Sequence, residues 1–382
     1  MRVGIFAPGL LMYGGGEKYV CKIAEILSRE HQVDLITATI SEREVEGVLK
    51  TLEERLNVNL GDVDLKALAI PSIVKKHFKI NLLTNNVALS KCSKKYDLFI
   101  NQSAEGRGVP PAYAKKNILI VQVSPPRVET SFLFGTALKF FFDANLSTYD
   151  KIVVYSSFVK KRVEQKYARK VEVLYPPIDS QPEHHVVKER WILSVGRFFE
   201  GGHSKKQLEM IRAFKHLYKD AELDEDHWEY HLVGGVSSDE KSQLYKSTCE
   251  KEAEGYPIFF HFNAPYETVK DLYGRSTLFW HATGFDEDEN RHPEKMESFG
   301  IVTAEAMSYG CIPVVVGKGG QPEIVHHGLN GMLWSNLEEL EESTLSLIKN
   351  PEKREKFSKA AAEASRQFQT DQFEISVGEL LI

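Results

Sequence analysis

The sequence contains little cysteine and no long hydrophobic run. Its four cysteines, among 382 residues, are scattered and never form a C-x-x-C pair, so neither a disulfide framework nor a zinc site is expected. No apolar run approaches the roughly 18 residues of a membrane-spanning helix. The N-terminal apolar segment is too short for a secretory signal. These absences predict a protein of a reducing compartment, the cytoplasm.

Two familiar nucleotide-binding signatures are also missing. An apolar strand at residues 2–7 leads into Gly14-Gly15-Gly16, but this loop lacks the G-x-G-x-x-G spacing of dinucleotide-binding folds and the Lys-Ser/Thr pair of a P-loop. Glycines at such a turn let backbone N–H groups approach a phosphate or a sugar closely, although a merely tight turn is the alternative. Nothing in the chain resembles a nucleic-acid-binding module, so no nucleic-acid partner is expected.

What the sequence does contain is a repeated alternation of strand and helix patterns. With 382 residues, 42% of them hydrophobic, the chain fits two domains of roughly 150–200 residues each. Short β-branched runs such as 118–121 and 312–316 alternate with helical periods in both halves, which predicts two parallel α/β domains. The proline-containing segment 174–179 indicates a linker. We therefore expect domains at residues 1–180 and 181–366.

Charge is distributed unevenly along the chain. Residues 1–180 carry 26 Lys and Arg against 19 Asp and Glu, whereas the remainder carries 22 against 35. A basic N-terminal domain could face an anionic acceptor, or make a peripheral contact with the inner face of a membrane. A solvated surface of uneven charge is equally consistent. The basic and aromatic segment 139–142 could contact a membrane interface, although a helix face in the core is the favoured interpretation.

The most informative stretch is residues 297–320. Ser298 is a good N-cap residue, and the following residues read as a helix up to Gly310, where glycine favours a stop. Glu297 stands in the loop ahead of that helix, and Glu305 lies on it. The N–H groups and dipole of a helix start favour an anion. A negatively charged ligand with hydroxyl groups would suit both features.

Cations precede this stretch in the same domain. Arg197 lies just past an apolar strand, and Lys205 lies at the start of the following helix, with Lys206 as the alternative register. Ligands of parallel α/β domains sit at the carboxyl ends of the strands, and two cations with a helix start suit a diphosphate. A ribose diol would suit Glu305, and a sugar ring would suit Glu297.

These residues carry a family resemblance. Glu297 and Glu305, with the glycine, proline and valine pattern after them, resemble the E-x7-E signature of the retaining glycosyltransferases of family 4, and segments 319–331 and 175–179 continue the pattern. The resemblance covers nearly the whole chain. It implies the α/β architecture called GT-B, in which two Rossmann-like domains with parallel sheets face each other across an interdomain cleft. It also implies that a C-terminal helix at about 367–382 returns to the first domain.

The resemblance further implies transfer of a hexose-type sugar from a UDP- or GDP-sugar to an acceptor hydroxyl of a glycan, a lipid-linked molecule or a small molecule. Arg197 and Lys205 would stabilise the departing diphosphate, and Glu297 would act near the reacting centre. No metal and no other cofactor are expected, because the acidic run 286–289 reads as a solvated insertion. The implied donor-binding residues are Gly15, Gly16, Lys206, His281, Phe299, Gly300, Ile301 and Glu305.

The chain departs from the family pattern at one point. Many members carry a histidine after a strand in the middle of the N-terminal domain, whereas here the nearest substitutes are Gln122 and Ser124. His281 occupies a frequent family position, although a structural histidine is nearly as well supported. Two other functions stay open: a sugar-nucleotide epimerase or hydrolase on the same scaffold, and an inactive partner subunit of glycosyltransferase type.

Overall fold

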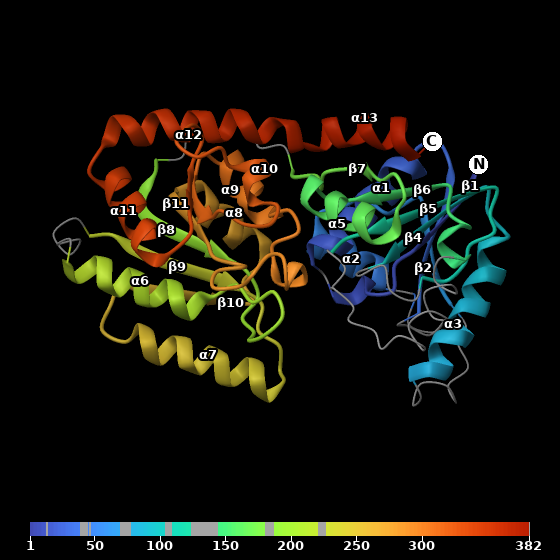
Figure 1. The fold of residues 1–382 in the computed structure, drawn as a ribbon, viewed down its shortest axis with the longest axis horizontal. Helices are drawn as coiled ribbons and strands as arrows, with labels where there is room; N and C mark the ends of the chain where they lie inside the picture. Colours follow the sequence, from blue (N-terminus) through green and yellow to red (C-terminus); the bar gives the residue numbers. More distant parts are fainter. Residues whose placement is uncertain are drawn as a thin grey trace. The chain divides into compact units, whose positions relative to one another are not determined.

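A computed structural model shows two compact units, one of Met1–Pro177 with Phe373–Ile382 and the other of Ile178–Gln372 (Figure 1). Two sequence features, Ser124 and the segment 139–142, lie outside the described residues. The structure describes residues 1–12, 14–38, 45, 47–68, 78–103, 109–123, 144–179, 187–220 and 227–381.

The first unit is built on a seven-stranded sheet with the order β3-β2-β1-β4-β5-β6-β7. Every pair of neighbouring strands is parallel. The strands are β1 (Arg2–Phe6), β2 (Gln32–Thr37), β3 (Val63–Ala67), β4 (Leu98–Ser103), β5 (Lys116–Val121), β6 (Lys151–Val154) and β7 (Glu172–Val173). The described α-helices are α1 (Gly15–Ser28), α2 (Val48–Leu56), α3 (Phe78–Ser93) and α5 (Ser157–Tyr167), and α13 (Thr370–Leu381) adds its C-terminal part.

Helix α1 begins directly at the glycine loop. Gly14 has an extended backbone, and its N–H donates to the Glu17 carboxylate at 2.9 Å, which caps the helix start. Tyr19 is fully buried, and its ring lies 5.3 Å from that of Phe373 in α13. This contact ties the C-terminal segment to the first unit.

The second unit contains a six-stranded parallel sheet with the order β10-β9-β8-β11-β12-β13. The strands are β8 (Glu189–Val195), β9 (Glu229–Gly234), β10 (Ile258–Phe262), β11 (Ser276–His281), β12 (Ile312–Val316) and β13 (Met332–Trp334). The described α-helices are α6 (Gln207–Asp220), α7 (Glu240–Ala253), α8 (Tyr266–Arg275), α9 (Ile301–Ser308), α10 (Gln321–Ile324), α11 (Leu337–Ile348) and α12 (Pro351–Ser365).

Helices cover both faces of this second sheet. In Figure 1, α9 and α12 lie above the strands, and α6 and α7 lie below them. The buried rings of Phe214, Tyr230 and Trp280 pack together beneath the sheet. Successive residues of a strand point to opposite faces of the sheet. Trp280 therefore faces α6, whereas the next residue, His281, emerges at the carboxyl end of β11 on the face of α9. Among the described residues, no helix has the length and apolar character needed to cross a membrane.

Candidate functional site

Glu297 lies at the centre of a hydrogen-bonded group in the second unit. Lys205 Nζ donates to Glu297 Oε2 at 2.6 Å, and His281 Nε2 lies 3.1 Å from the same oxygen. Lys205 comes from the loop between β8 and α6, His281 from the end of β11, and Glu297 from the loop before α9. The structure thus gathers three of the candidate residues at the carboxyl ends of neighbouring parallel strands, the usual place for a ligand.

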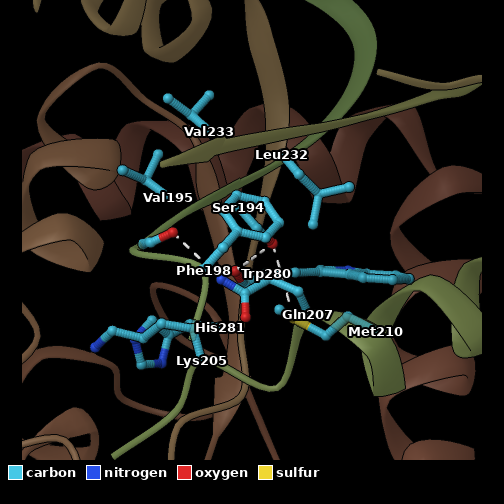
Figure 2. Close-up of a pocket in the computed structure, with 11 residues that line it drawn as sticks. Ser194, Val195, Phe198, Lys205, Gln207, Met210, Leu232, Val233, Trp280 and His281 are labelled. Atoms are coloured by element: carbon cyan, nitrogen blue, oxygen red, sulfur yellow. Dashed lines mark hydrogen bonds between the residues drawn. The ribbon is translucent and has the colours of Figure 1, made fainter. Parts of the chain in front are cut away.

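Lys205 and His281 also line a small pocket. Figure 2 shows their side chains side by side at one end of it, with Trp280 and Met210 farther along. Gln207, the first residue of α6, donates from its amide to the carbonyls of Gly196 and Arg197. These bonds fix the loop after β8, and this loop carries the candidate cations.

Burial and neighbouring charges shift the pKa values of Glu297 and His281. Burial alone would raise the pKa of the Glu297 carboxyl, but the Lys205 ammonium and the His281 hydrogen bond outweigh burial and hold that pKa well below its usual range. Burial lowers the pKa of His281, with Glu297 opposing the shift. At neutral pH the group therefore contains an ionised carboxylate, an ammonium and a neutral imidazole.

Sequence reasoning missed His203, which lies in the glycine-containing loop before Lys205. Burial lowers the pKa of His203; Lys205 and Arg197 lower it further, and Glu297 opposes them. Arg197 is exposed, and its guanidinium lies 5.6 Å from the centre of the Phe199 ring. Arg197 and Lys205 thus act electrostatically on the same imidazole. The only sequence signal was the loop's position at a strand end.

Lys206 faces a different carboxylate from its neighbour. Its backbone has a positive φ of 55°, and its ammonium lies 3.6 Å from Glu287, which also accepts from Lys295 at 2.8 Å. The sequence left the choice between Lys205 and Lys206 open, and the structure puts Lys205 at Glu297. The acidic run is engaged as well, because Asp288 accepts backbone N–H bonds from Asn290 and Arg291.

The start of α9 depends on a glycine backbone. Gly300 has a φ of 113°, in the left-handed region that disfavours side chains, and it precedes Ile301, the first helical residue. A Cβ at Gly300 would lie 2.8 Å from Gln321 Nε2. Phe299 is buried against Phe368, with ring centres 5.1 Å apart. Phe299, Gly300 and Ile301 thus form the turn that aims the helix N-terminus.

Replacing Gly300 with alanine is therefore expected to lower the free energy of unfolding of the second unit by about 2 kcal/mol. All four tryptophans, Trp191, Trp228, Trp280 and Trp334, lie in this unit, so urea unfolding followed by tryptophan fluorescence measures it. Gly201→Ala is the matched control, because Gly201 also has a positive φ of 91° but has open space around its Cβ position. An equal loss in both variants would show that the contact with Gln321 contributes nothing.

Glu305 lies on α9 and faces α8. Tyr273 of α8 donates its hydroxyl to Glu305 Oε2 at 3.3 Å, and the Tyr309 ring stacks on Tyr273 with centres 5.5 Å apart. Near them, the Tyr266 hydroxyl donates to Asp179 at 3.0 Å. These phenols were missed from sequence, where aromatic residues in a helix read as core. The Tyr273 hydroxyl fixes the orientation of the Glu305 carboxylate, and a carboxylate can accept hydrogen bonds from a diol.

Gly15 and Gly16 are the first two residues of α1, and Gly16 has close contacts within the first unit. The Gly16 carbonyl accepts from Gln102 at 2.9 Å, and a Cβ at Gly16 would lie 2.6 Å from Gln122 Nε2. Gln122 in turn donates to the Tyr155 hydroxyl at 2.7 Å. Gln122, one of the two substitutes for the missing histidine, thus packs directly against the glycine loop. The described residues contain no cluster of three or more His, Cys, Asp or Glu arranged to hold a metal ion.

Two Rossmann-like units with parallel sheets define the fold class of the GT-B glycosyltransferases, as solved structures confirm. The chain matches a glycosyltransferase from Rickettsia africae with a TM-score of 0.69, at 16% identity over 100% of this chain and 97% of that one. It matches Anabaena Alr3699/HepE in complex with UDP with a TM-score of 0.68, at 16% identity over 100% and 99%. These likenesses establish the fold.

Sequence comparison names the class of enzyme. Residues 177–364 match the family described as glycosyl transferases group 1. An uncharacterized glycosyltransferase of Methanocaldococcus jannaschii is 23% identical over 302 residues, 77% of this chain and 78% of that protein. The chain is a glycosyltransferase, and its second unit carries the group 1 domain.

Proposed function

We propose that the chain is a retaining glycosyltransferase that moves a hexose-type sugar from a UDP- or GDP-sugar to an acceptor hydroxyl without a metal ion. The observation that carries this proposal is the group formed by Lys205, His281 and Glu297 beside the start of α9. It combines a cation, a carboxylate and a neutral imidazole at the strand ends, within the domain that matches the group 1 family. The UDP complex of the Anabaena neighbour supports a nucleotide ligand.

The chemistry follows from where charge develops. As the bond between the sugar and the diphosphate breaks, negative charge grows on the diphosphate and positive charge grows on the sugar ring. Lys205, Arg197 and the N-terminus of α9 stabilise the first, and Glu297 stabilises the second. The acceptor oxygen forms its bond on the face that the diphosphate leaves, and the departing diphosphate takes the hydroxyl proton. The anomeric configuration is thereby retained.

Metal independence is proposed because fixed cations can supply the charge that a metal would provide. The acidic run that could imitate a metal-binding pair is already engaged: Glu287 contacts Lys206 and Lys295, and Asp288 accepts backbone N–H bonds. We expect transfer to continue in EDTA. A requirement for Mg²⁺ or Mn²⁺ that EDTA abolishes would contradict this part of the proposal.

The decisive experiment mixes the protein with UDP- and GDP-sugars and measures nucleotide release with and without a panel of glycan, lipid-linked and small-molecule acceptors. Release that depends on an acceptor supports the proposal. Release without an acceptor would identify a hydrolase, and interconversion of the donor sugar would identify an epimerase. Absence of binding to any nucleotide or nucleotide sugar, measured by calorimetry, would indicate an inactive subunit.

The basic first unit is proposed to make a peripheral contact with the cytoplasmic face of a membrane. The support is the excess of Lys and Arg over Asp and Glu in residues 1–180. Co-sedimentation with vesicles of anionic lipid, compared with neutral vesicles and repeated at raised salt, tests the contact. Equal recovery of the protein with both vesicle types would contradict the proposed membrane contact.

Glu305 is proposed to hold the ribose of the nucleotide. Glu305→Ala is therefore expected to raise the dissociation constant for the preferred nucleotide at least about tenfold, equivalent to about 1.4 kcal/mol, and calorimetry measures it. Tyr273→Phe should give a smaller increase, because it removes only the hydroxyl that orients Glu305. Tyr309→Phe is the control, since the buried Tyr309 hydroxyl has no hydrogen-bond partner among the described residues. Unchanged affinity in Glu305→Ala would contradict this role.

A further inference from the structure

Gln321, the first residue of α10, forms a hydrogen bond with His281 of the candidate site. Its side chain is fully buried, and its amide Nε2 lies 3.1 Å from Nδ1 of His281. The other polar atom of that side chain, Oε1, has no hydrogen-bond partner among the described residues. Within the described part of the chain, the only hydrogen bond of this buried amide is thus the one to His281. A buried amide held in this way calls for an explanation.

The two ring nitrogens of His281 have different tasks. Nε2 faces Glu297 at 3.1 Å, with the Thr283 hydroxyl at 3.4 Å, and Nδ1 faces Gln321. A neutral imidazole has one N–H and one lone pair. If Nε2 carries the hydrogen, it donates to the carboxylate, and Nδ1 accepts from the amide N–H of Gln321. In the other tautomer a lone pair would face the ionised Glu297, and the amide would have to turn its oxygen toward Nδ1.

We propose that Gln321 is a positioning residue: its amide holds His281 in the tautomer whose Nε2–H donates to Glu297. An amide N–H accepts no hydrogen bond, so it can contact only the unprotonated Nδ1. The hydrogen then lies on Nε2, where Glu297 needs a donor. Gln321 thus acts on a carboxylate that it does not touch, through the histidine whose tautomer it fixes, just as outer partners fix the tautomer of metal-bound histidines.

This role matters most when the donor arrives. In the structure, Glu297 Oε2 has two partners, Lys205 and His281. Under the proposed function, on which this step rests, Lys205 turns toward the diphosphate and leaves Glu297 with the imidazole. An ionised carboxylate that is 17% exposed needs a remaining donor. His281 supplies it only in the tautomer that Gln321 selects, and Glu297 stays aimed at the sugar.

Nitrogen-15 NMR of the histidine side chains tests the proposal, because the two tautomers have distinct ring-nitrogen shifts. The His281 signals are assigned by their loss in His281→Asn. The wild-type protein should show the Nε2–H form. Gln321→Leu, which keeps the volume but removes the N–H, should populate the Nδ1–H form. A fully retained Nε2–H form in this variant would overturn the proposal, since Glu297 alone would then fix the tautomer.

A second variant keeps the test decisive if Gln321→Leu does not fold. Gln321→Glu replaces the donor with an acceptor, so Nδ1 should gain a hydrogen while Nε2 keeps its own. His281 would then be an imidazolium between two carboxylates, that of Glu297 and the one introduced by the substitution, with Thr283 and Lys205 as the other polar neighbours. A neutral Nε2–H imidazole beside an ionised introduced carboxylate at pH 7 would overturn the proposal.

Kinetics separate positioning from a purely structural role. In Gln321→Leu, kcat should fall about tenfold while the dissociation constant for UDP or GDP stays within about twofold. Thr344→Val is the control, because it removes the buried hydroxyl that accepts from Trp280 Nε1 at 3.1 Å. Trp280 is next to His281 in sequence, but its side chain lies on the opposite face of β11. The control substitution should lower stability and leave the His281 tautomer unchanged. A tautomer shift in Thr344→Val as well would overturn the specific role of Gln321, whereas absent nucleotide binding in wild type would count against the proposed function alone.

Discussion

Replacing Glu297 with glutamine is expected to lower kcat at least about a hundredfold and to leave the affinity for the nucleotide unchanged or slightly higher. The substitution keeps the shape of the side chain but removes the negative charge proposed to stabilise the sugar ring as positive charge develops on it. Losses of about 10²–10³ are typical when a preorganised electrostatic partner is removed. Nucleotide affinity is spared because Lys205, no longer paired with a carboxylate, becomes available to the diphosphate.

Steady-state kinetics with saturating acceptor measure the first effect, and calorimetry with UDP or GDP alone measures the second. Glu363→Gln is the matched control, because Glu363 is an exposed carboxylate of α12 that pairs only with Arg366 among the described residues. It should leave both quantities unchanged. A Glu297→Gln variant that lost nucleotide binding but kept its turnover with bound donor would show that Glu297 binds the nucleotide part of the donor, and would exclude the proposed role.

The fold class could be predicted from sequence because its signal is local. The β-branched runs 118–121 and 312–316 are fully buried strands in the structure, and strands buried on both faces read as continuous apolar runs. The order of the strands could not be predicted in the same way. β1 pairs with β2 and β4, and β8 pairs with β9 and β11, and this order depends on how the crossover helices pack rather than on any short pattern.

The sequence indicated individual residues of the candidate site but not their contacts, because a contact depends on tertiary packing and not on a short pattern. Lys205 and Glu297 were named individually, but they are 92 positions apart, and nothing in either segment predicts their contact. The choice between Lys205 and Lys206 depends on the backbone of Lys206, which has a positive φ. A lysine in the sequence does not predict that conformation. Gln321 and Tyr273 were missed because a single buried polar or aromatic residue gives no periodic signal.

The pairing of Lys205 with Glu297 should make the second unit sensitive to removal of either partner. Lys205→Met is expected to lower its free energy of unfolding by about 3 kcal/mol at pH 7, because it leaves a largely buried carboxylate without its main counter-charge. Lys205→Met combined with Glu297→Gln should recover most of that loss, since no unpaired charge remains. Both variants should be inactive, so recovered stability without activity separates folding from catalysis.

The pH dependence follows from the direction of the shift. The pKa of Glu297 is depressed in the folded chain, so its contribution to stability is fully present above its unfolded pKa of about 4.3 and is lost as the pH falls below that value. The advantage of wild type over the double variant should therefore be largest near pH 7 and should shrink toward pH 3. Urea unfolding followed by tryptophan fluorescence measures it, because every tryptophan lies in the second unit. A Lys205→Met variant as stable as wild type at pH 7 would show that His281 alone suffices to hold the Glu297 charge.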